Sequence, residues 1–167
     1  NAIPPMLEGK NVLGQAKTGT GKTAAFGIPM IQKLDPKSGH VEGLVLAPVR
    51  ELAQQITDDI NSYAKYTDVW VMSIYGGVSI NGQIQELRKN PTIVAGTPGR
   101  VIDQIKRGHL DLRHVKMVAL DEADRMFDMG FFEDIEWILN KTPRNRQVSL
   151  WIATFDARTR RLSAKYM

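Results

Sequence analysis

The stretch Ala16-Lys17-Thr18-Gly19-Thr20-Gly21-Lys22-Thr23 decides how the rest of the sequence is interpreted. A short and mostly apolar run at 11–15 comes before it, and residues typical of a helix follow at 23–33. The stretch therefore lies where a strand turns into the N-terminus of a helix. That context is typical of a loop that binds phosphate groups.

Each residue type in this loop has a physical role in holding phosphates. Gly19 and Gly21 allow turn conformations that a Cβ would block, so that backbone N–H groups converge on an anion at the positive end of a helix. Lys22 can reach the β- and γ-phosphates, and the Thr23 hydroxyl can ligate Mg²⁺. The general pattern begins with glycine, whereas this sequence has Ala16. The residues expected to bind a nucleotide are Ala16, Lys17, Thr18, Gly19, Thr20, Gly21, Lys22 and Thr23.

The composition is typical of one intracellular globular domain. The 167 residues can bury a sizeable core, and the content of 43% hydrophobic and 24% charged residues is ordinary. No apolar run approaches membrane-spanning length and no secretory signal pattern is present, so we expect a cytoplasmic or nuclear protein without a membrane partner. Nothing suggests more than a monomer. Because the sequence begins with Asn1, we expect it to be a segment of a longer protein.

Charge and metal-ligating residues narrow the function only a little. The net charge of +4 permits nucleic-acid binding but does not argue for it alone. Cysteine is absent, which excludes disulfides and thiolate metal sites. His40, His109 and His114 lack zinc-ligand spacing, so we expect them to be solvated or locally hydrogen-bonded.

Strand-like and helical patterns alternate along the whole sequence, which is the signature of an α/β fold. Strands are expected at 11–15, 43–47, 69–75, 92–96, 117–120 and 147–153. Helices are expected at 23–33, 52–60, 80–87, through Ile102 and Ile105, at 131–139 and at 157–166. Near-continuous apolar strands joined by helices predict a parallel sheet covered on both faces, with ligands beyond the carboxyl ends of the strands. Regular apolar patterns surround Trp70, Trp137 and Trp151, which we expect to be core or partly buried.

An acidic cluster, Asp121-Glu122-Ala123-Asp124, follows the apolar strand at 117–120. A carboxylate at the end of a buried strand is costly without a partner, and Mg²⁺ held jointly with Thr23 would supply one for Asp121. Glu122 could orient and deprotonate a water that attacks a γ-phosphate. Asp124 is expected to bond protein groups. An acid-rich helix N-terminus is the alternative, which the upstream loop at the same end of the sheet disfavours.

Six motifs in this order resemble those of the DEAD-box RNA helicases. They are Ala16 to Thr23, Pro48-Val49-Arg50-Glu51-Leu52-Ala53, Gly76-Gly77, Thr97-Pro98-Gly99-Arg100, Asp121-Glu122-Ala123-Asp124 and Ile152-Ala153-Thr154. Together they cover nearly the whole chain and match the first of that family's two RecA-like domains.

The resemblance implies an ATP-dependent RNA helicase with ATP and Mg²⁺ as ligands. By resemblance, Lys22, Asp121 and Glu122 carry catalysis, and Thr23 and Asp121 hold the metal. RNA is implied as the polymer, gripped through its backbone by Pro48, Arg50, Gly76, Gly77, Thr97 and Arg100.

Two departures from the family pattern predict weaker RNA contact and weaker coupling between ATP hydrolysis and RNA remodelling. Val49 stands where the family usually has threonine, so we expect weakened RNA contact. Ile152 stands where the family has serine, and the missing hydroxyl would ordinarily help link the acidic cluster to the rest of the site. We therefore expect impaired coupling between hydrolysis and RNA remodelling through Asp124, Thr154 and Ile152, with nucleotide binding spared.

The resemblance also implies partners outside this sequence. A second RecA-like domain with arginine fingers and a glutamine segment that reads adenine are expected elsewhere in the parent protein. Arginine fingers are worth about 10³–10⁵ in rate, so we expect this chain alone to hydrolyse ATP very slowly and not to unwind RNA. Two alternatives stay open at this point. One is a non-catalytic nucleotide- or RNA-binding module or regulatory fragment, and the other is a P-loop ATPase that acts on DNA or protein.

Overall fold

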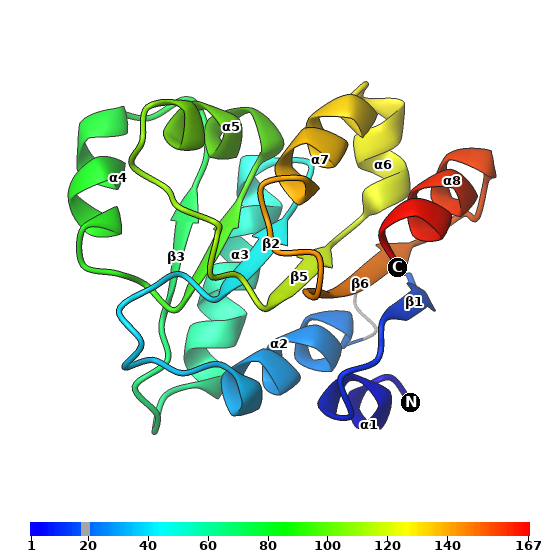
Figure 1. The fold of residues 1–167 in the computed structure, drawn as a ribbon, viewed down its shortest axis with the longest axis horizontal. Coiled ribbons are helices and arrows are strands. Elements are labelled where there is room, and N and C mark those ends of the chain that lie inside the picture. Colours follow the sequence, from blue (N-terminus) through cyan, green and yellow to red (C-terminus); the bar gives the residue numbers. More distant parts are fainter. Residues whose placement is uncertain (18–20) are drawn as a thin grey trace.

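A single parallel sheet organises the chain (Figure 1). The computed structural model describes residues 1–17 and 21–167. The six strands are β1 (Val12–Gln15), β2 (Gly43–Leu46), β3 (Val71–Ile74), β4 (Ile93–Gly96), β5 (Met117–Leu120) and β6 (Gln147–Ile152). Their order in the sheet is β1-β6-β5-β2-β4-β3, and every neighbouring pair is parallel. The predicted α/β fold with a parallel sheet is therefore confirmed.

Helices cover both faces of this sheet, as predicted (Figure 1). The first face carries α1 (Ile3–Leu7), α2 (Lys22–Lys33) and α3 (Arg50–Tyr63). The second carries α4 (Ile80–Leu87), α5 (Pro98–Lys106), α6 (Ala123–Asp128), α7 (Phe132–Leu139) and α8 (Ala157–Tyr166). No helix in the described ranges is long and apolar enough to cross a bilayer.

The core forms two apolar clusters, one on each side of the sheet, because successive side chains of a strand point to opposite faces. In β2, Leu44 and Leu46 join the cluster beneath α4 to α8, whereas Val45 joins the cluster beneath α1 to α3. Most described strand residues are buried, which explains the continuous apolar runs of the sequence. The tryptophans behave as predicted, since Trp151 lies in the core and Trp70 and Trp137 pack against it half-buried.

The sequence predicted all six strands within two residues of their ends, but it missed two helices. Helix α1 begins with Ile3-Pro4-Pro5 and has five residues, too few for a visible helical period. A residue far away in the sequence holds this helix in place, because the Gln147 side chain donates to the carbonyl oxygen of Met6 at 2.9 Å. Helix α6 has six residues and follows Glu122 directly. Neither helix is encoded by a local pattern.

Parallel strands bring all the flagged motifs to one edge of the sheet, as predicted. Backbone hydrogen bonds continue past the strand ends there, for example from Ala47 N to Gly96 O at 3.0 Å and from Asp121 N to Leu46 O at 2.9 Å. The strand order divides this carboxyl edge into two halves. We call the ends of β1, β6 and β5 the acidic half and the ends of β2, β4 and β3 the arginine half.

Candidate functional site

The acidic half is built around a buried ion pair. Asp121 directly follows β5, and its side chain is fully buried. Lys22 opens α2, and its Nζ lies 2.8 Å from Asp121 Oδ1 with only 9% of the side chain exposed. The two residues stand at the ends of β5 and β1, the two strands that flank β6. The partner that the sequence analysis required for Asp121 is thus a protein cation in this structure.

Beyond this ion pair, Asp121 has few partners in the part of the chain that the structure describes. Within residues 1–17 and 21–167, neither carboxylate oxygen accepts a hydrogen bond of good geometry, although Lys22 lies close. Burial raises the pKa of Asp121 above its usual value, and the Lys22 ammonium offsets this only in part. A buried carboxylate with free lone pairs is suited to a further cation or donor.

Glu122 occupies a strained position beside this pair. Its φ of 50° and ψ of 49° lie in the left-handed region, which costs a residue with a Cβ about 1–3 kcal/mol. Its side chain is 23% exposed, and Oε2 lies 3.6 Å from Arg125 Nη1. Strained backbone is frequent in active sites, so this geometry supports a functional role for Glu122.

Asp124 connects the acidic cluster to the end of β6. Its Oδ2 accepts hydrogen bonds from the backbone N–H groups of Ala153 at 3.1 Å and Thr154 at 3.0 Å. This matches the expectation that Asp124 bonds protein groups. The Ile152 side chain is 2% exposed and packs in the core, so the link is made by backbone and not by residue 152.

The structure describes the phosphate-loop candidates in part. Gly21 adopts a left-handed conformation, with φ of 79°, as the cap before α2. Ala16 continues the ladder by donating its N–H to Ile152 O at 3.0 Å. The predictions for Thr18, Gly19 and Thr20 fall outside the described residues.

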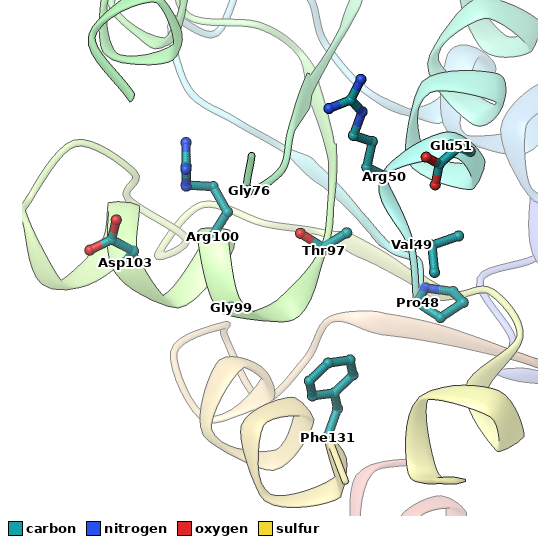
Figure 2. Close-up of a pocket in the computed structure, with 10 residues that line it drawn as sticks. All are labelled: Pro48, Val49, Arg50, Glu51, Gly76, Thr97, Gly99, Arg100, Asp103 and Phe131. Atoms are coloured by element: carbon teal, nitrogen blue, oxygen red, sulfur yellow. The ribbon is translucent and has the colours of Figure 1, made fainter. Parts of the chain in front are cut away.

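The arginine half forms an open pocket of about 680 Å³ (Figure 2). It is lined by Pro48, Val49, Arg50, Glu51, Gly76, Thr97, Gly99, Arg100, Asp103 and Phe131. Five of the six residues predicted to contact RNA are among them. The sixth, Gly77, lies beside Arg50: its φ is 83°, and a Cβ there would lie 3.6 Å from Arg50 Nη1.

Two helices begin at this pocket without a side-chain cap. Val49 precedes α3 and Thr97 precedes α5, and neither side chain accepts a bond from the first turn. First-turn N–H groups and the positive end of the helix dipole therefore face the pocket, which favours anions. Figure 2 shows the Thr97 hydroxyl directed toward Gly76 and Arg100.

The two arginines of the pocket are held by neutral partners. Arg50 lies over the Tyr75 ring, with Cζ 5.5 Å from the ring centroid. Arg100 donates to Gln83 Oε1 at 3.0 Å and to Val78 O at 3.3 Å. Within the part of the chain that the structure describes, neither guanidinium pairs with a carboxylate. Their positive charge is therefore available to a ligand.

In residues 1–17 and 21–167, no group of three or more histidine or acidic side chains converges on a common point. His40 and His114 are exposed and stack on each other, with ring centroids 3.7 Å apart and planes 10° apart. Stacked imidazoles direct their nitrogens in parallel planes, so this pair does not converge on one ion. Both histidines are exposed, as expected from the sequence.

Comparison with known proteins decides the family. The family model for the DEAD/DEAH box helicase matches residues 1–162. The chain belongs to the DEAD/DEAH box helicase family. The resemblance inferred from the six motifs is therefore confirmed.

Characterised DEAD-box relatives are close in sequence but longer. An ATP-dependent RNA helicase CshA of Listeria monocytogenes is 51% identical over 165 residues, which cover 99% of this chain and 32% of the relative. A DEAD-box ATP-dependent RNA helicase CshA of Geobacillus kaustophilus is 50% identical, with coverage of 99% and 35%. The chain thus spans about a third of the length of these relatives.

Solved DEAD-box structures share the fold. A DEAD box protein from Methanococcus jannaschii superposes with a TM-score of 0.94 at 43% identity, covering 99% of this chain and 46% of that one. A hypothetical ATP-dependent RNA helicase from Sulfolobus tokodaii gives a TM-score of 0.90 at 41% identity, with coverage of 100% and 48%. The chain therefore has the RecA-like fold of DEAD-box helicases.

Several pocket residues were missed by the sequence analysis. Phe131 enters from the turn before α7, and Figure 2 shows its ring on the side of the pocket opposite the two guanidinium groups. Asp103 lies one turn into α5. Gln83 and Tyr75 do not line the pocket but contact its arginines, Gln83 by a hydrogen bond to Arg100 and Tyr75 through its ring under Arg50. No local pattern marks these residues, because their place depends on which elements meet at the edge.

Proposed function

We propose that this chain is the ATP- and RNA-binding RecA-like domain of an ATP-dependent RNA helicase. The acidic half would bind Mg-ATP and the arginine half would bind the sugar-phosphate backbone of single-stranded RNA. The observation that carries the proposal is that the two halves of one sheet edge differ in charge. One half holds the buried pair of Lys22 and Asp121, and the other holds two arginines that pair with no carboxylate among the described residues. Its membership of the DEAD/DEAH box family supports the same assignment.

In the acidic half, Lys22 would exchange its contact with Asp121 for the phosphates of ATP. The ammonium opens α2, so a phosphate at that helix N-terminus lies within reach. Gly21, in the left-handed conformation, lets the backbone turn toward the same anion. With the remaining loop residues, Ala16 to Thr23 would form the nucleotide cradle.

Asp121 and Thr23 are suited to hold Mg²⁺. Magnesium is commonly bound by one or two protein ligands together with substrate phosphates, which agrees with a single buried carboxylate that has free lone pairs. When bound, the ion would supply positive charge to the phosphates. Glu122 would then orient a water and accept its proton. The Asp124 carboxylate, which accepts hydrogen bonds from the backbone N–H groups of Ala153 and Thr154, would keep the cluster attached to the end of β6.

In the arginine half, Arg50 and Arg100 would each contact a phosphate, and the uncapped starts of α3 and α5 would donate N–H groups to others. Exposed glycines, such as Gly76, let the RNA backbone approach closely. These contacts read the backbone and not the bases, so we expect little sequence preference.

We further propose that hydrolysis and unwinding need a second RecA-like domain of the parent protein. The curated relatives extend well beyond the matched region, which supports this view. The chain alone would bind ATP, turn it over very slowly and leave RNA duplexes intact.

Calorimetric titration with ATP in Mg²⁺, combined with phosphate release with and without oligouridylate, tests the nucleotide half. We expect the unsubstituted chain, called the parent chain or parent in the experiments below, to bind ATP. Asp121→Asn should bind ATP at least tenfold more weakly, and Glu122→Gln should bind it like the parent chain. Glu122→Gln should abolish the slow turnover. Parent-like ATP affinity in Asp121→Asn would contradict the proposed site.

A further inference from the structure

Arg100 is fixed in place by Gln83, a residue of α4. Arg100 Nη1 donates to Gln83 Oε1 at 3.0 Å, and both Nη atoms lie within 3.4 Å of Val78 O. Gln83 is 8% exposed, although it is polar and lies in a helix of only eight residues. A buried amide needs partners, and here it finds one in the guanidinium.

The other end of the Gln83 amide is also occupied. Its Nε2 donates to the carbonyl oxygen of Tyr75 at 3.0 Å. A carbonyl only accepts and a guanidinium only donates, so the two partners fix which way the amide faces. Gln83 therefore ties Arg100 to the end of β3, directly before Gly76.

Tyr75 is in turn the support of the second arginine. Arg50 lies over its ring, and the Tyr75 hydroxyl donates to Gln54 Oε1 at 3.2 Å. The ring is thus held by α3, the same helix that Arg50 opens. Through Gln83 and Tyr75 the two guanidinium groups are linked to one residue.

We infer that Tyr75 and Gln83 are positioning residues that set the spacing of Arg50 and Arg100 for successive phosphates of RNA. The inference rests on the proposed function of the pocket. Arginine side chains lose rotamer freedom when they bind, and holding them beforehand reduces that cost. Neutral partners achieve this without neutralising the charge, whereas a carboxylate in the same place would compete with the phosphate.

A double-mutant cycle on RNA affinity tests the Gln83 arm. Fluorescein-labelled decauridylate is titrated by anisotropy against the parent, Gln83→Met, Arg100→Met and the double variant. We expect Arg100→Met to bind about tenfold and Gln83→Met about fivefold more weakly. In the Arg100→Met background, Gln83→Met should change affinity by less than twofold. Gln85→Met, an exposed position on the same helix, is the matched control and should bind like the parent.

Two more variants separate positioning from folding. Gln83→Glu keeps an acceptor for Arg100 but adds a carboxylate and loses the donor to the Tyr75 carbonyl, so it should bind RNA about tenfold more weakly. Thermal unfolding of this variant shows whether the fold is kept. Tyr75→Leu removes the ring under Arg50 and should bind about threefold more weakly, but only when Arg50 is present.

The outcomes distinguish the inference from the function it rests on. Equal losses from Gln83→Met with and without Arg100 would overturn the positioning role and leave the RNA pocket standing. Parent-like affinity in Gln83→Glu would overturn it as well. An unchanged affinity in Arg100→Met would instead contradict the proposed RNA surface itself.

Discussion

At the ends of β1, β6 and β5 a buried ammonium lies 2.8 Å from a buried carboxylate, whereas at the ends of β2, β4 and β3 two arginines lie among neutral partners. The ion pair at the centre of the acidic half thus compensates its own charge and is buried. The arginine half stays open and keeps its charge. The two halves of one sheet edge therefore differ in burial and in the charge that they present.

The difference shows that sequence motifs which are equally recognisable can have different structural roles, one in the fold and one in ligand binding. Lys22 and Asp121 hold one another and contribute to the fold, so changing one affects stability. Arg50 compensates no buried charge, so changing it should affect ligand binding alone. Arg100 compensates none either, but it also satisfies the buried amide of Gln83.

The largest effect is expected from Lys22→Met. This change leaves the carboxylate of Asp121 buried without a cation and should lower the free energy of unfolding by about 3 kcal/mol at pH 7. Urea unfolding measures it. The double variant Lys22→Met/Asp121→Asn should recover most of the lost stability. Lys10→Met is the control: it breaks an exposed ion pair with Glu8 and should change the free energy of unfolding little. A parent-like midpoint in Lys22→Met would mean that the pair does not support the fold.

The pH dependence of stability should carry a signature of Asp121. Burial raises the pKa of Asp121 in the folded chain above the unfolded value near 3.8. The folded chain therefore binds this proton more tightly than the unfolded chain does. The contribution of this proton to the free energy of unfolding is fully present below pH 3.8 and is lost as pH rises through the folded pKa. Relative to Asp121→Asn, the parent should therefore lose stability with increasing pH from about 4 upward. Urea unfolding of both proteins over this range checks the sign, and a difference that grows in favour of the parent would contradict it.

A smaller gain in stability is expected from Val49→Thr in the arginine half. Val49 is extended, with φ of −137° and ψ of 156°, at the cap position of α3, where a hydroxyl can accept a first-turn N–H. Threonine should raise the free energy of unfolding by about 1 kcal/mol, and Val49→Ala should not. RNA titration of the same variants tests the separate prediction that Val49 weakens RNA contact. Identical stability of the two variants would show that no cap forms.

The smallest effect is expected from Arg50→Met on folding. The Arg50 guanidinium lies over the Tyr75 ring and neutralises no carboxylate among the described residues, so the change should stay within about 0.5 kcal/mol of the unsubstituted chain. Thermal unfolding of this variant checks the prediction. A loss as large as that of Lys22→Met would remove the distinction between the two halves.

Much of this arrangement could be predicted from the sequence because its signals are local. Strand β2 is a continuous apolar run and α3 repeats Leu52, Ile56 and Ile60 on one face, so fold class and element order followed. The motifs indicated that the site lies at the carboxyl edge of the sheet, because they come directly after strands. Thr18, Gly19 and Thr20 were predicted to hold phosphate, and these assignments remain predictions together with the other site roles.

What could not be predicted depends on contacts between distant segments. Lys22 and Asp121 are 99 positions apart, and nothing local says that they meet. The link from Asp124 to the end of β6 uses backbone donors, which no side-chain pattern reveals. The expected effect of Ile152 on coupling stays a prediction. Gln83 looks like a surface residue of a polar helix until Arg100 is placed beside it.

The most direct test of the account is the affinity of decauridylate for the parent and for Arg50→Met/Arg100→Met as a function of salt. Arg88→Met/Arg113→Met removes the same two charges from exposed positions outside the pocket and serves as the control. We predict about 100-fold weaker binding by the pocket variant, a salt slope smaller by about 1.4, and little change in the control. Equal losses in the two double variants would contradict the account, because RNA would then follow net charge and not the arginine half of the sheet edge.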